Sequence, residues 1–433
     1  MEAARGGDEA GSIAIRPVHE CARPPSAGTG RSRTEGRTDV DIGDITAELE
    51  RYLGPDAEDL SLPPAAFTSP ELWEVERQLV FGRSWVLVAH VDELAETGSY
   101  VSLSVAGEPV VVVRGQDGAL NGLSPVCRHR LMPVVEEGTG RTDVFTCPYH
   151  LWRYALDGRL VGATHMKRNP AFDPAACRLP AFAVEEWQGF VFVNLDASAE
   201  PLGPHLRRIG EDLVNYRLPE LTQVAGWTEE WHCNWKIAVE NAHENYHVMG
   251  FHPETLQPTT PGSARTTVRA DSPWADSMRV RYAEPLEPVV LDLTEEERAH
   301  LYGFFVFPSG SLAASGDMVI WLSLLPTSID RTLVRGGVLM PSALLDGQDR
   351  EAVRKEAEAY AARINGEDRH GLEAVQRGAA SRFAERGHLS PKEPGVLLFY
   401  RSLARALLRD DADWPGELYP PLERVAPSLP TRP

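Results

Sequence analysis

The segment "HENYH" at residues 243–247 combines two histidines and a carboxylate in a pattern that can bind a metal ion. His243, Glu244 and His247 fit H-E-x-x-H, in which two histidines on one helix face hold zinc and the glutamate activates water. His252 follows five residues after His247, one position too early for the longer metzincin motif. The segment alone therefore leaves two interpretations open, a zinc hydrolase and a site for a different metal.

About a hundred residues upstream, two short segments each carry one cysteine followed by one histidine. "CRHR" gives Cys127-x-His129 and "CPYH" gives Cys147-x2-His150, with 17 residues between His129 and Cys147. Finger-type zinc sites usually place cysteine with cysteine and histidine with histidine. In a Rieske [2Fe–2S] centre two cysteines bind one iron and two histidines the other, which suits one of each per loop. The spacing favours this cluster over structural zinc.

The composition is that of an ordinary globular protein. The chain has 433 residues, enough for two to three domains, and 42% of them are hydrophobic. Its formal charge of −20 argues against nucleic-acid binding, which needs clustered lysine and arginine. No apolar run approaches the roughly 20 residues of a membrane-spanning helix, and no secretion signal is visible. Five cysteines favour metal ligands over a disulfide framework and indicate a cytoplasmic location.

Turn signals and hydrophobic periodicity divide the chain into five regions. Residues 1–40 show no periodicity and predict a disordered tail, whereas residues 41–82 predict amphipathic helices. Residues 83–196 contain short apolar runs separated by turn dipeptides, Asp-Gly among them, and predict an all-β module. Residues 197–425 mix helices and strands, and residues 426–433 form a short tail.

Three of the helices predicted in the mixed region contain or flank the candidate metal-binding residues. The periodicity predicts one helix over residues 234–250, which would place His243 and His247 on the same face. It predicts two further helices over residues 349–365 and 371–386.

Both metal motifs occur in the order found in one known family. "CRHR…CPYHLWRYALDGRL" and "NWKIAVEN" resemble the Rieske non-heme iron oxygenases, in particular the large (alpha) subunits of ring-hydroxylating dioxygenases and related monooxygenases. The resemblance covers nearly the whole chain after about residue 60. It implies an α+β fold, in which an all-β Rieske domain (83–196) joins a catalytic domain (197–425) with an antiparallel sheet covered by helices, of helix-grip or START-like type. Helices in residues 41–82 are expected to pack on the catalytic domain.

In the first domain the resemblance implies a cluster with four protein ligands. Cys127 and Cys147 are expected to bind one iron, and His129 and His150 the other. Neutral imidazole ligands raise the potential, so such a cluster accepts electrons from ordinary ferredoxins. The chain has no dinucleotide-binding fingerprint, so electrons from NAD(P)H must arrive through a separate reductase, directly or by way of a ferredoxin.

In the second domain the resemblance implies a mononuclear Fe(II) held by two histidines and a carboxylate, with positions left open for O2. His247 and His252 are the expected histidines. In "EDRHGLEAVQRG", Asp368 lies eight residues before Gln376, as the family's third ligand does. Glu367 is the competing candidate.

Glu244 has a different role in each interpretation. In a zinc hydrolase it activates water. The resemblance instead implies a homotrimer in which the cluster of one subunit faces the iron of the next, and Glu244 bridges His150 of one subunit to His247 of its neighbour. His243 is then either a packed residue or an outer donor to the site.

The reaction expected from the resemblance is hydroxylation or oxidative demethylation of a small organic substrate with O2. "NWKIAVENAHENYH" and "LLPTSIDRT" look most similar to the choline, glycine-betaine and carnitine monooxygenase branch. An aromatic ring-hydroxylating dioxygenase and a natural-product tailoring oxygenase are the alternatives. A zinc hydrolase is the remote alternative, because it leaves the upstream cysteine–histidine pairs unexplained.

Overall fold

The structure is a computed structural model that describes residues 42–54, 59–408 and 424–425. The predicted tails over residues 1–40 and 426–433 lie outside the described residues. In the described part of the chain, no helix combines the length and apolar character needed to cross a membrane.

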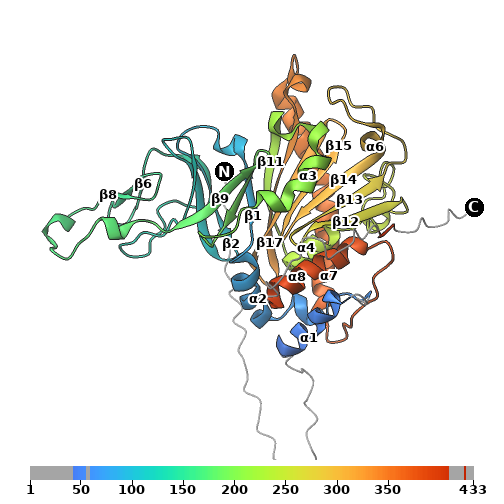
Figure 1. Ribbon diagram of the computed structural model, residues 1–433, viewed down its shortest axis with the longest axis horizontal. Coiled ribbons are helices and arrows are strands. Elements are labelled where there is room, and N and C mark those ends of the chain that lie inside the picture. Colours follow the sequence, from blue (N-terminus) through green and yellow to red (C-terminus); the bar gives the residue numbers. More distant parts are fainter. Residues whose placement is uncertain (1–41, 55–58, 409–423, 426–433) are drawn as a thin grey trace, which may run out of the picture. The chain divides into compact units, whose positions relative to one another are not determined.

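An all-β module occupies residues 86–194 (Figure 1). Its strands are β1 (Val86–His90), β2 (Ser99–Val105), β3 (Glu108–Arg114), β4 (Leu120–Leu123), β5 (Gly138–Arg141), β6 (Phe145–Thr146), β7 (Arg153–Tyr154), β8 (Leu160–Gly162), β9 (Ala181–Trp187) and β10 (Phe190–Asn194). A seven-stranded sheet has the order β1-β10-β9-β4-β3-β2-β5, and β6-β7-β8 form a small separate sheet. Gly118 and Gly158 have φ angles of 81° and 84°, so both predicted Asp-Gly turns occur, each between two paired strands.

A second antiparallel sheet of eight strands follows. Its strands are β11 (Leu221–Trp231), β12 (Thr266–Ser272), β13 (Ala275–Arg281), β14 (His300–Val306), β15 (Gly310–Ser315), β16 (Met318–Ser328), β17 (Arg331–Pro341) and β18 (Arg424–Val425). The order is β11-β17-β16-β15-β14-β13-β12-β18. One face packs on β1, β10 and α3 (Arg207–Asp212) through side chains such as Phe304 and Trp321.

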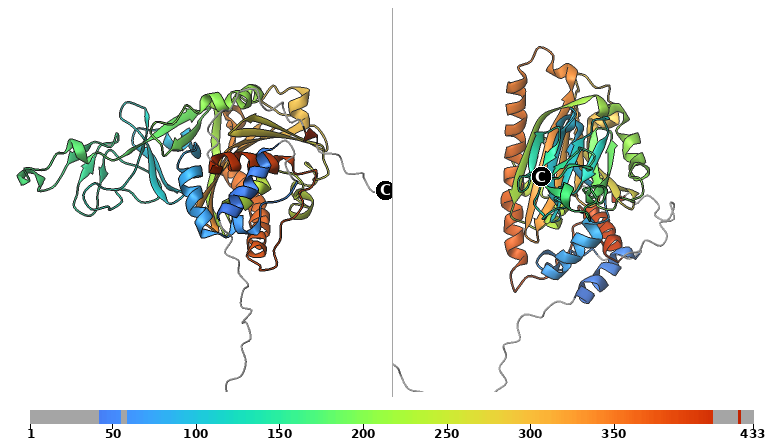
Figure 2. Two further views of the ribbon diagram at one scale, coloured as in Figure 1. Left: turned by 60° about the horizontal axis from the view of Figure 1, so that its bottom comes forward. Right: turned by 90° about the vertical axis from the view of Figure 1, so that its left-hand side faces the viewer.

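The opposite face of this sheet is covered by helices. The 30-residue helix α7 (Arg350–Ala379) runs along it, as Figure 2 shows. The prediction of two helices in this region is wrong, because α7 continues through Gly366 and Gly371. A glycine costs only about 1 kcal/mol in a helix, and packing against the sheet readily outweighs this cost.

The predicted helix over residues 234–250 is also wrong. Two shorter helices replace it, α4 (Trp235–Ala242) and α5 (Val248–Phe251). The five residues between them, 243–247, are those of the "HENYH" motif. His243 and His247 therefore do not share one face of a continuous helix.

The N-terminal helices pack against the last long helix. α1 (Ile42–Leu53) lies beside α8 (Pro394–Leu408), where the rings of Tyr52 and Tyr400 are 5.0 Å apart. α2 (Pro70–Glu76) then leads toward the all-β module. With the remaining helix, α6 (Glu295–Ala299), these elements complete the predicted α+β architecture.

A buried ion pair connects α2 to α4. Glu76 Oε1 lies 2.6 Å from Lys236 Nζ, and the two side chains are 0% and 1% exposed. The indole N–H of Trp235 donates to the other carboxylate oxygen of Glu76 at 2.9 Å. Burial lowers the pKa of Lys236, and the neighbouring Glu76 carboxylate opposes this change. The pair thus holds the start of α4, the helix that leads to the candidate site.

Lys236→Met should lower the free energy of unfolding by about 3–5 kcal/mol, because it leaves the Glu76 carboxylate buried without a cation. Arg207→Met is the control, since Arg207 and Glu211 form an ion pair whose side chains are 71% and 59% exposed. Its effect should stay within about 0.5 kcal/mol. Urea denaturation followed by tryptophan fluorescence measures both, and equal midpoints for the two variants would show that the buried pair is not a stabilising contact.

Candidate functional site

The start of α4 is tied to α7. The side-chain oxygen of Asn234 accepts a hydrogen bond from the N–H of Lys236 at 3.0 Å and so caps the helix. The backbone N–H of Asn234 donates to the Gln376 side-chain oxygen on α7 at 2.8 Å. The start of α4 is thus fixed relative to α7. Asn241, near the end of α4, lies beside Asp368 of α7.

Glu244 stabilises the break after α4. Its Oε2 accepts hydrogen bonds from the backbone N–H of His247 at 3.0 Å and from that of Tyr246. The carboxylate thus binds the backbone N–H groups that immediately precede α5. Its Oε1 lies 2.6 Å from His247 Nδ1. On α8, a Cβ at Gly395 would stand 2.1 Å from the His243 carbonyl oxygen, so the bend fits only against a glycine.

Two histidines and one carboxylate converge at this bend. One donor atom from each of His247, His252 and Asp368 lies within 4.8 Å of the other two. Asp368 Oδ1 is 3.0 Å from His252 Nε2 and 3.8 Å from His247 Nε2. This donor set and spacing fit one metal ion, and two histidines with one carboxylate suit a non-heme Fe(II) with open positions.

Neighbouring polar groups orient this triad. Glu367 Oε2 lies 2.7 Å from His252 Nδ1 and accepts from the Thr255 hydroxyl at 2.6 Å. The Asn241 amide donates to Asp368 Oδ1 at 3.0 Å. Burial lowers the pKa of His252, but the two carboxylates outweigh it and the pKa is raised overall. Glu367 therefore lies behind the ring and directs the proton to Nδ1, which leaves Nε2 free for a metal.

Asp368→Ala should lose the mononuclear iron and keep the visible spectrum of the cluster, because the two centres draw on separate residues. Glu367→Ala should still bind iron, about 10- to 100-fold more weakly, since it removes only the support of His252. Iron per chain and the absorption spectrum measure both effects. An empty site in Glu367→Ala beside a filled one in Asp368→Ala would mean that the third ligand is misassigned.

The two cysteine–histidine loops, residues 127–132 and 147–152, share one backbone geometry. In each loop the N–H of the cysteine donates to the carbonyl of the sixth residue, at 2.9 and 2.8 Å. The fifth residue of each, Leu131 and Leu151, has a left-handed φ of 59° and 62°. The two loops thus have equivalent backbone conformations.

The side chains of these loops fit an iron–sulfur cluster. Cys127 and Cys147 are buried free thiols, and the rings of His129 and His150 are 4.6 Å apart. Within the described residues, the buried Nδ1 of His150 has no hydrogen-bond partner, as expected of an atom reserved for a metal. Burial and the neighbouring His129 lower the pKa of His150, which favours the neutral imidazole that binds iron.

Two aromatic residues complete the cluster loops, and no sequence spacing indicated them. Tyr154 Oη lies 3.2 Å from Cys127 Sγ and accepts from the N–H of Arg128 at 3.0 Å, so its own proton is available to the sulfur. The Trp152 ring stacks on His129 with centroids 4.7 Å apart. The roles of Tyr154 and Trp152 become visible only from their contacts in the folded protein.

Tyr154→Phe should lower the reduction potential of the cluster, because a hydrogen bond to the sulfur stabilises the more negative reduced state. A bond that is about 1 kcal/mol stronger in that state corresponds to a decrease of about 40 mV. Tyr100→Phe is the control, since Tyr100 stands in the same module and packs on Phe145. Redox titration of both variants measures the shift, and equal potentials would remove the role of Tyr154.

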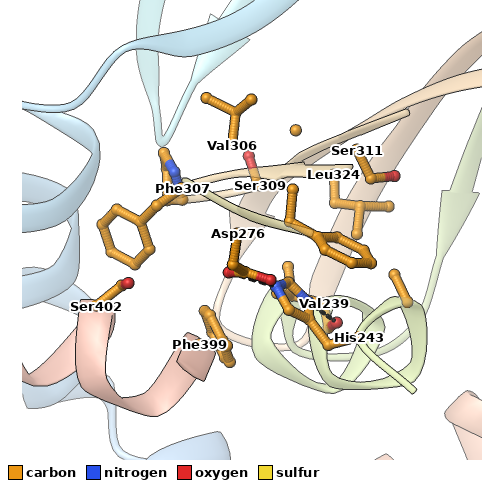
Figure 3. A pocket seen from close by; sticks show the side chains of 14 residues that line it. Val239, His243, Asp276, Val306, Phe307, Ser309, Ser311, Leu324, Phe399 and Ser402 are labelled. Carbon is orange, nitrogen blue, oxygen red and sulfur yellow. Dashed lines mark hydrogen bonds and ion pairs between the residues drawn. The ribbon is translucent and has the colours of Figure 1, made fainter. Parts of the chain in front are cut away.

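His243 belongs to a different environment (Figure 3). It is 5% exposed, its Nδ1 lies 2.7 Å from the Val239 carbonyl oxygen, and its ring stacks on Phe305 at 3.8 Å. Its Nε2 is 3.6 Å from Asp276 Oδ2. These contacts are those of a packed histidine outside the triad, so the match to H-E-x-x-H does not describe a zinc site here.

A cavity of about 250 Å³ opens beside the triad. It lies between α4, α7 and the covered face of the eight-stranded sheet, and its lining includes Glu244, His247, His252 and Asp368. The arrangement can hold a small molecule next to a metal ion.

Two family models match the two modules. Residues 84–183 match the Rieske [2Fe-2S] domain, and residues 218–409 match the catalytic domain of the ring hydroxylating alpha subunit. The chain therefore belongs to the Rieske non-heme iron oxygenases, enzymes that oxidise small molecules with O2 by means of a [2Fe–2S] cluster and a mononuclear iron. This confirms the family, the α+β fold and both cofactors expected from the sequence.

Within this family the chain is similar to monooxygenase oxygenase subunits. It is 27% identical to the carnitine monooxygenase oxygenase subunit of Escherichia coli K12, over 82% of this chain and 96% of the relative. It is 32% identical to the glycine betaine monooxygenase oxygenase subunit of Chromohalobacter salexigens, over 49% and 47%. The structure of a quaternary ammonium Rieske monooxygenase with L-carnitine superposes with a TM-score of 0.68 at 25% identity, covering 84% of this chain and 98% of that one.

Proposed function

We propose that this chain is the oxygenase component of a multicomponent monooxygenase that hydroxylates or demethylates a small organic molecule. The observation that carries the proposal is the convergence of His247, His252 and Asp368 in the wall of a cavity of about 250 Å³. The similar carnitine and glycine betaine proteins are oxygenase subunits, which supports a separate reductase as electron donor, directly or through a ferredoxin. Dependence on NAD(P)H and this reductase is consistent with a cytoplasmic location.

In this proposal the bound cluster supplies electrons and the bound Fe(II) a position for O2. Cys127, His129, Cys147 and His150 hold the cluster, and His247, His252 and Asp368 hold the iron. Neighbouring protein groups fix the protonation and the orientation of the iron ligands. Glu244 fixes the His247 ring through Nδ1, and the Asn241 amide donates a hydrogen bond to the Asp368 carboxylate.

We further propose a homotrimer. Among the described residues, no hydrogen bond or ion pair joins the cluster loops to the iron ligands. Each centre instead has exposed apolar neighbours, Leu131 (79%) and Leu151 (58%) at the cluster, and Tyr246 (38%) and Met249 (39%) at the iron site. Exposed apolar side chains at both centres suit a contact between two copies of the chain. Glu244 would then link His247 to His150 of the partner subunit.

Oxidation of an aromatic ring is the second candidate. The chain is 34% identical to the biphenyl dioxygenase alpha subunit of Metapseudomonas furukawaii, over 41% of this chain and 42% of the relative. The apolar cavity beside the triad also suits a ring.

Glu244→Gln tests the link between the subunits. It keeps the shape of the side chain but removes its charge and one acceptor, so both metal centres should stay filled and the cluster reducible. Multiple turnover should fall by about 100-fold. Iron content, the dithionite-reduced spectrum and oxygen uptake with a surrogate reductase measure these three properties. Normal turnover by this variant would remove the proposed role.

Mixed trimers test the geometry. Chains with Cys127→Ser lack the cluster, and chains with Glu244→Gln lack the bridge. When the two are combined, some contacts pair an intact cluster with an intact bridge, so partial activity should return. Light scattering confirms the trimer, and well-folded mixed trimers without recovery would contradict the bridge.

A further inference from the structure

His243 of the "HENYH" motif lies outside the metal triad, yet both nitrogens of its ring contact other groups. Its Nδ1 lies 2.7 Å from the Val239 carbonyl oxygen, which can only accept, so this nitrogen carries a proton. Its Nε2 faces Asp276 Oδ2 at 3.6 Å, and Figure 3 shows the carboxylate beside the ring. The His243 ring is therefore held from two sides.

The register of two neighbouring strands places the groups that surround this ring. Asp276 on β13 lies directly opposite Phe305 on β14, so their side chains stand on the same face of the sheet. The His243 ring stacks on the Phe305 ring with centroids 3.8 Å and planes 24° apart. The sheet thus supplies both the ring on which His243 stacks and the carboxylate that its Nε2 faces.

Phe305 separates two spaces in the protein. It lines the cavity of about 250 Å³ beside the triad, and it also lines a small cavity of about 10 Å³ together with His243 and Asp276. Among the described residues that line the larger cavity, neither His243 nor Asp276 occurs. His243 can therefore affect a molecule in the larger cavity only through Phe305.

We infer that His243 is a positioning residue, which fixes the Phe305 ring in the wall and thereby sets the width of the cavity beside the triad. Protein interiors are closely packed, so a ring backed by a second ring at contact distance has no room to retreat when a molecule enters. The wall would yield to a larger molecule if this backing were absent. The inference gives His243 a part in substrate selection only if the proposed function holds, whereas its effect on Phe305 can be measured without turnover.

Crystals of the iron-loaded holoenzyme under xenon pressure test this inference, because xenon enters apolar cavities. In His243→Ala the Phe305 ring should move by about 1 Å or more into the vacated space, where it regains packing contacts, and more xenon should bind beside the triad. His243→Asn can still donate to the Val239 carbonyl but lacks the ring, so it should show the same shift. An unmoved Phe305 ring in these variants, with xenon bound behind it, would overturn the inference.

A double variant should restore the wall. His243→Phe with Asp276→Leu keeps a flat ring behind Phe305 and replaces both members of the polar pair by apolar groups, so Phe305 should keep its wild-type position. A displaced ring in this variant would contradict backing by the ring of residue 243.

His90→Ala is the matched control, because His90 is also a buried histidine, 1% exposed, and packs edge-on against Phe190 at 5.5 Å. It should leave both Phe305 and the xenon beside the triad unchanged. An equal shift of Phe305 in this control would show general loosening of the protein and would also overturn the inference. Absence of iron and cluster from the wild-type protein would contradict the proposed function itself, while the position of Phe305 would still decide the role of His243.

Discussion

The approach of His252 to Asp368 is the contact on which the iron site depends. The two residues are 116 positions apart, yet Nε2 and Oδ1 are 3.0 Å from each other. The approach is permitted by Gly371, one turn beyond Asp368 on α7, where a Cβ would stand 2.2 Å from the Phe251 ring. A side chain at this position would require the Phe251 ring to move out of the contact between α5 and α7. The bond between Asn234 and Gln376 ties the start of α4 to α7.

The two metal centres use one physical principle in different folds. Each centre brings its donor atoms together and fixes them through a second set of groups. At the iron site carboxylates occupy the Nδ1 atoms of both histidines. At the cluster, Tyr154 bonds a sulfur and Trp152 stacks on a histidine. The ligands are thereby oriented before a metal binds.

The motifs and the resemblance they carry were sufficient to predict the family and the fold class, and three of the predicted ligands, His247, His252 and Asp368, lie together in the structure. Prediction from the sequence failed where long-range packing decided the outcome. The break at residues 243–247 depends on a side chain that caps its own segment and on Gly395 from α8, and neither is visible in local periodicity. The continuity of α7 through two glycines depends on the sheet beneath it. Asp368 and Glu367 look equivalent in sequence, but successive helix positions differ by about 100° in direction, so they face opposite nitrogens of one histidine ring.

Chemistry and specificity reside on different elements of the catalytic domain. The metal-binding side chains come from the segment after α4 and from α7, whereas much of the substrate wall comes from alternate positions of the antiparallel sheet. Because strand side chains alternate between two faces, residues such as Ile320 can change without altering the core formed by Trp321 on the other face. A family of this architecture can therefore change the shape of its cavity while its triad stays in place.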